Sequence, residues 1–79
     1  MKFRIFTMDQ SGRLFQLGVH GWARGGGTNF PGIEETRDFI YHSVIPDVPE
    51  ALDSYIALVD DVGMIELTFP IIPDNVEKI

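Results

Sequence analysis

Two stretches near the start of the chain alternate between apolar and polar positions. They read MKFRIFTM over residues 1–8 and RLFQLGVHGWA over residues 13–23. A period of two places alternate side chains on opposite faces of a β-strand. The intervening DQSG of residues 9–12 has the composition of a turn, so the pattern predicts an antiparallel β-hairpin.

Helical spacing of apolar residues appears next. A first helix is predicted from about Pro31 or Ile33 to Ile45, because two glutamates suit its first turn and Pro46 ends it. A second helix is predicted over residues 47–61, DVPEALDSYIALVDD, where Asp47 and Glu50 have the spacing of a capping box. Its apolar stripe consists of Leu52, Tyr55, Ile56 and Val59, widened by Ala51 and Leu58.

Alternation returns over residues 64–72, MIELTFPII, and predicts a third strand, followed by the polar tail 73–79. The predicted order is therefore β-β-α-α-β in a single domain, residues 1–79. We expect a small two-layer α+β fold, in which an antiparallel three-stranded sheet carries two helices on one face.

Charge is divided unevenly along the chain, whose net charge is −6. Residues 1–32 hold four cationic side chains against one acidic residue, a net charge of +3, and residues 33–79 hold eleven acids against two cations, a net charge of −9. An acidic surface of this strength repels nucleic acid and attracts cationic partners. We therefore expect a protein partner with a basic surface, and no direct contact with nucleic acid.

The chain contains no cysteine, which excludes disulfides, thiolate metal ligands and a cysteine nucleophile. Arg4 and Asp9 interrupt the apolar run expected of a secretory signal, and no stretch reaches the ~20 apolar residues of a membrane-spanning helix. These features predict a cytoplasmic location, with no membrane association.

A run of three glycines, Gly25–Gly27, raises the question of a phosphate-binding loop. The run lacks both the lysine of a P-loop and the spacing of a dinucleotide fingerprint. We therefore expect a flexible loop that contacts a partner, with Trp22 and Arg24 beside it, because both residue types are frequent in binding hot spots.

Residues suited to catalysis or metal binding are few. Asp38 and His42 share a face of the first predicted helix, but a metal site needs three or four ligands. His20 has no acidic neighbour in sequence, and no serine lies in a nucleophile-elbow context. We expect no catalytic site, no metal and no cofactor.

The acidic residues of the two predicted helices form the main candidate site. Regular spacing on rigid helices would let their carboxylates imitate a phosphate backbone. The candidate partner-binding residues are Glu34, Glu35, Asp38, Glu50, Asp53, Asp60, Asp61, Trp22 and Arg24.

In size, acidity, lack of cysteine and lack of catalytic motifs, the chain resembles the small phage-encoded inhibitors known as anti-CRISPR proteins. That resemblance implies inhibition of a CRISPR effector complex by blocking its DNA-binding surface, in the cytoplasm of the host cell. We expect a small acidic binding protein that inhibits a larger basic, nucleic-acid-handling partner.

A different class of function is also open, that of a non-catalytic structural or oligomerisation module. Its basis is a second apolar face of the predicted hairpin, formed by Phe6, Met8, Leu14 and Trp22. Exposed apolar patches of this kind often mark an interface, which here would form a homodimer.

Overall fold

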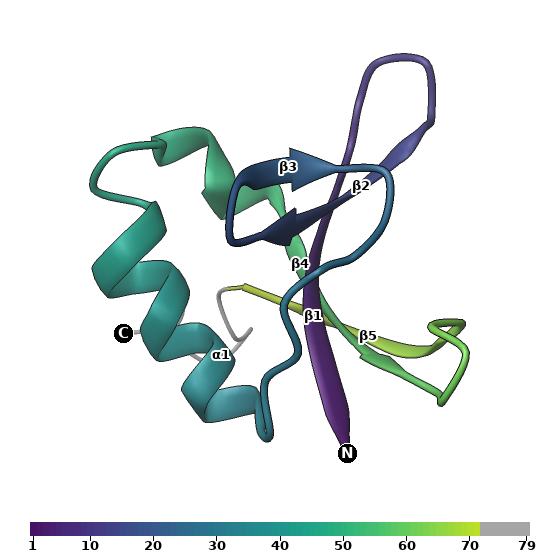
Figure 1. Ribbon diagram of the computed structural model, residues 1–79. Helices are drawn as coiled ribbons and strands as arrows, with labels where there is room; N and C mark the ends of the chain where they lie inside the picture. The colour runs from purple at the N-terminus through teal and green to yellow at the C-terminus, as the bar shows by residue number, and fades with distance from the viewer. Residues whose placement is uncertain (72–79) are drawn as a thin grey trace.

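The computed structural model describes residues 1–71, a five-stranded sheet with a helical segment at one side (Figure 1). The strands are β1 (Lys2–Met8), β2 (Leu14–Gly18), β3 (Gly21–Ala23), β4 (Tyr55–Val59) and β5 (Ile65–Pro70). The helical elements are α1 (Ile33–Phe39), the π-helical turn η1 (Ile40–Val44) and the 3₁₀ turn η2 (Pro49–Asp53). The predicted polar tail, 73–79, lies outside the described residues.

Every strand pairing in the sheet is antiparallel, and the strand order is β3-β2-β1-β4-β5. β1 occupies the centre, with β2 on one side and β4 on the other. The helical segment follows β3 and precedes β4, so the chain leaves one edge of the sheet and returns beside the central strand.

This architecture corrects the predicted fold class. A three-stranded sheet with two helices in β-β-α-α-β order is wrong, because residues 1–71 hold five strands and one short helix. The first predicted helix is confirmed: α1 continues directly into η1, where the Ile45 N–H donates to the Ile40 carbonyl as the i→i+5 pattern of a π-turn requires.

The second predicted helix, residues 47–61, is wrong. Pro49–Asp53 form a single 3₁₀ turn, and Tyr55–Val59 form the strand β4. Ile56 and Val59 were expected on one helical stripe, but they belong to clusters on opposite faces of the sheet. A strand separates residues three apart in this way, and the β-branched and aromatic residues of YIALV suit it.

The predicted hairpin is confirmed for β1 and β2, which pair from Phe6 opposite Gln16 to Met8 opposite Leu14. The stretch 13–23 is not one strand, however. The chain reverses at Val19–His20, and Gly21, with a φ of +106°, begins the short strand β3. Three residues are too few for alternation to reveal a separate strand.

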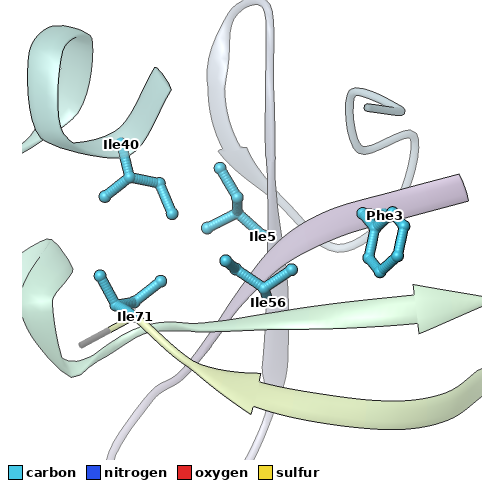
Figure 2. Packing of buried hydrophobic residues seen from close by; sticks show 5 residues of the cluster. All are labelled: Phe3, Ile5, Ile40, Ile56 and Ile71. Atoms are coloured by element: carbon cyan, nitrogen blue, oxygen red, sulfur yellow. The ribbon is translucent and has the colours of Figure 1, made fainter. Parts of the chain in front are cut away.

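The main core lies between the sheet and the helical segment. The helix-face cluster consists of Phe3, Ile5, Ile40, Ile56 and Ile71, none more than 7 % exposed. Ile40 projects from the helical segment toward Ile5 and Ile71 (Figure 2). Burying such side chains stabilises the fold by about 1.5–3 kcal/mol each relative to exposure.

The opposite face of the sheet, which we call the open face, carries a smaller cluster. Its buried members are Phe6, Ala57 and Val59, with Leu14 and Tyr55 packed against them. The rings of Phe6 and Tyr55 stack with their centroids 6.0 Å apart and their planes 12° apart.

Candidate binding surfaces

The glycine-rich loop is built into the sheet. Phe30 and Phe3 exchange two backbone hydrogen bonds of 2.8 and 2.9 Å, and the Thr28 N–H donates to the Leu17 carbonyl at 3.0 Å. Residues 28–30 therefore run beside β1 where β2 has diverged from it. The loop closes this gap in the sheet, which gives it a structural role.

A polar network on the open face holds this loop in place. The Arg4 guanidinium donates to Asn29 Oδ1 at 2.7 Å and to Gln16 Oε1 at 3.0 Å, and the Gly27 N–H also donates to Gln16 Oε1 at 3.1 Å. Gly27 is buried so close to Gln16 that a β-carbon there would lie 2.9 Å from the Gln16 β-carbon. Close packing thus requires a glycine at this point of the run.

The acidic residues of the first helix point to solvent. Glu34, Glu35 and Asp38 are exposed on α1, while Thr36 on the opposite side is fully buried. The Thr36 hydroxyl donates to the Gly32 carbonyl at 2.7 Å. This bond and the packing of Ile40 fix which side of the helix faces the sheet, and so leave the three carboxylates outward.

Three further acidic residues follow in the turns after this helix. Asp47, Glu50 and Asp53 are exposed, the last two on η2. The six exposed carboxylates of the stretch 33–53 form what we call the acidic layer: Glu34, Glu35, Asp38, Asp47, Glu50 and Asp53. The α1–η2 segment lies at one side of the sheet (Figure 1).

Asp60 and Asp61 are separated from the acidic layer. They lie at the β4–β5 turn, at the opposite side of the molecule from α1 (Figure 1). Asp60 Oδ1 accepts hydrogen bonds from the N–H groups of Val62 and Met64, at 3.0 and 2.8 Å. That carboxylate caps its own turn. The predicted row of carboxylates along one long helix is therefore wrong, because the long helix is absent.

Trp22 and Arg24 face different surroundings. Trp22 is half-buried on β3 and packs against the helix-face cluster, whereas Arg24 is exposed, with its guanidinium carbon 5.9 Å from the centre of the Phe15 ring. Trp22 does not share a face with the rest of the proposed apolar hairpin face. The strand register places Phe6, Met8 and Leu14 together on the open face, and Trp22, opposite Leu17, on the other.

The open face also carries cations, which the sequence split between the β-hairpin and the loop. A groove of about 560 Å³ lies between the β1–β2 and β4–β5 hairpins, with Arg13 and Arg24 among its lining residues. We call it the arginine groove. Its second wall, Met64 and Ile65, comes from the far end of the chain, so only the sheet topology brings the groove together.

Groups suited to metal chemistry do not gather within residues 1–71. No set of three or more histidine, aspartate or glutamate side chains in that range is placed to hold a metal ion. Asp38 and His42 lie on the same helical segment, both exposed, and His20 lies at the exposed β2–β3 turn. Among the described residues, no helix has the length and apolar character needed to cross a membrane.

Comparison of the chain with protein-family models, with curated proteins and with solved structures found no match.

Proposed function

We propose that this protein is a small acidic binding protein that attaches to a basic, nucleic-acid-binding surface of a larger partner and thereby inhibits it. The proposal rests on one observation about the stretch 33–53. All six of its acidic side chains are exposed, whereas its single cation, Arg37, is half-buried and donates to the Pro70 carbonyl at 3.3 Å.

The charge of this layer favours a cationic partner. Six carboxylates against one guanidinium give the stretch 33–53 a net charge of −5. Such a field attracts a positive groove and accelerates association with it, most strongly at low ionic strength. A groove that normally binds a phosphate backbone has the matching charge. A CRISPR effector complex is one partner of this kind, and acting on it places the protein in the host cytoplasm.

The proposed activity is stoichiometric and involves no catalysis or cofactor. Asp60 and Asp61 are left out of the contact surface, since they lie away from the acidic layer. Within the layer, Glu34, Glu35 and Asp38 share one rigid helix, so we expect them to contribute more than Glu50 and Asp53 on the single 3₁₀ turn η2.

The test compares two variants with equal changes in net charge. Glu34→Lys with Asp38→Lys alters the acidic layer, and Asp61→Lys with Glu66→Lys alters exposed carboxylates of the β4–β5 hairpin. Each immobilised protein is used to capture binding partners from a bacterial lysate, and the captured proteins are quantified by mass spectrometry.

We expect the wild type and the β4–β5 variant to capture the same basic nucleic-acid-binding protein, which added double-stranded DNA then displaces. The acidic-layer variant should retain about tenfold less of it, equivalent to about 1.4 kcal/mol. Equal retention by the two variants, or retention that DNA does not reduce, would contradict the proposal.

A further inference from the structure

The arginine groove is a second binding surface, separate from the acidic layer and independent of the function proposed above. It lies on the open face, which the helical segment does not cover. Phe6 and Leu14 belong to the open-face cluster, and Met64 and Ile65 come from the β4–β5 hairpin. Arg13 and Arg24 complete the set of lining residues used here.

The cations of this groove are held in defined positions. Arg13 Nε lies 3.1 Å from Asp9 Oδ2 and 3.0 Å from Ser11 Oγ, yet its side chain remains 61 % exposed. Arg24 is exposed beside the Phe15 ring. A guanidinium held this way loses less conformational freedom on binding and matches a carboxylate with two parallel donors.

The apolar part of the groove is unusually exposed for so small a protein. Met64 is 64 % exposed and Ile65 is 37 % exposed, and Met8, next to Leu14 in the strand register, is 56 % exposed. Clustered exposed apolar side chains mark interaction surfaces. Methionine in particular adapts to differently shaped apolar partners because its side chain is flexible and polarisable.

These features select a peptide over a nucleic acid. Single-stranded nucleic acid binds by stacking bases on exposed aromatic rings, but Phe6, the aromatic residue that lines the groove, is only 2 % exposed. The net charge of −6 also opposes a polyanion. A short segment with a few carboxylates and large apolar side chains matches both the arginines and the methionine-lined wall.

We propose that the arginine groove binds a peptide segment of a partner protein in which acidic residues alternate with large apolar ones. The probe is a fluorescein-labelled synthetic peptide in which leucine and phenylalanine are interspersed with aspartate and glutamate. Binding is measured by fluorescence anisotropy at about 0.15 M salt, where exposed charges more than ~8 Å apart are largely screened. Two control peptides replace either the acidic residues by serine or the apolar residues by serine.

Matched variants locate the binding site. Arg24→Glu is compared with Lys2→Glu, which makes the same change in net charge outside the groove. Met64→Ser is compared with Val62→Ser, since Val62 is 82 % exposed on the same hairpin but does not line the groove. Circular dichroism confirms that each variant is folded.

We expect saturable binding of the acidic-apolar peptide, weakened about tenfold by Arg24→Glu and about threefold by Met64→Ser, with less than about twofold change for Lys2→Glu and Val62→Ser. Both serine-substituted peptides should bind more weakly than the probe. Absence of saturable binding, or equal losses within either matched pair, would overturn the proposal.

Two other occupants are distinguished in the same experiment. Tighter binding of a labelled oligothymidine than of the peptide, lost in Arg24→Glu, would replace the proposal with a nucleic-acid site. Self-association in light scattering that Arg24→Glu abolishes would show that a second copy of this chain fills the groove, and would equally overturn it.

Discussion

Gly27 illustrates how a single residue decides the course of the glycine-rich loop. A β-carbon at this position would lie 2.6 Å from Gln16 Oε1, 2.9 Å from the Gln16 β-carbon and 3.3 Å from Arg4 Cδ. Gly27→Ala should therefore destabilise the protein by about 1–3 kcal/mol, because strand or loop must shift to relieve the overlap. Urea unfolding measures the change.

Gly25 provides the control for this prediction. A β-carbon there meets nothing within 4 Å, so Gly25→Ala should be neutral or stabilise by up to about 1 kcal/mol through the unfolded chain. If both substitutions proved equally tolerated, the close approach of the loop to Gln16 would be contradicted.

Asp9 links the β1–β2 turn to pH. Its pKa is lowered below the ordinary value, first by the hydrogen bond from the Ser11 hydroxyl and next by that from the Arg13 backbone N–H. A lowered pKa in the folded state stabilises the protein above the ordinary aspartate value of about 3.9, and this contribution disappears as the pH falls through the folded-state pKa.

The difference in melting temperature between the wild type and Asp9→Asn should accordingly shrink as the pH is lowered from about 6 to about 2. Thermal unfolding followed by circular dichroism over this range measures it. A difference that is constant or grows toward low pH would show that the Asp9 carboxylate is not preferentially stabilised in the folded protein.

At the scale of elements, locally encoded features were predictable and others were not. The β1–β2 hairpin and the helix after Gly32 carry their own turn and helix-start signals, so the sequence predicted both. β4 was mistaken for part of a helix, because Leu52, Tyr55, Ile56 and Val59 fit a helical spacing equally well. Its strand conformation depends on pairing with β1 and β5, which are distant in sequence.

Ile56 and Leu52 distinguish the two conformations experimentally. In a helix over 47–61 they would share a face and similar burial, whereas in the structure Ile56 is 0 % exposed and Leu52 is 41 % exposed. Ile56→Ala should cost about 2–5 kcal/mol in unfolding free energy, and Leu52→Ala less than about 1 kcal/mol. Equal costs in urea unfolding would favour the helix.

For the whole molecule, the sequence predicted the amount of charge better than its arrangement. The acidic second half is real, but the fold sends the carboxylates of the stretch 33–53 to one side and those of the β4–β5 turn to the other. The arginine groove could not be predicted, because Arg13 and Met64 meet only through the sheet order. Charge sorting in space depends on topology, which no local pattern reports.

Trp22 makes the cooperativity of the whole molecule measurable, because it is the chain's single tryptophan. It packs against the helix-face cluster and shares a small hollow with Val48 and Ala51, so β3 is tied to both the core and η2. Unfolding in urea followed by Trp22 fluorescence and by far-ultraviolet circular dichroism should therefore give coincident transitions, as expected for a single cooperative unit. The slope of the unfolding free energy should be about 1 kcal/mol/M, at the low end of the range for small proteins. A fluorescence midpoint at lower urea would mean that the β2–β3 hairpin opens separately, and that Trp22 contributes little to the core.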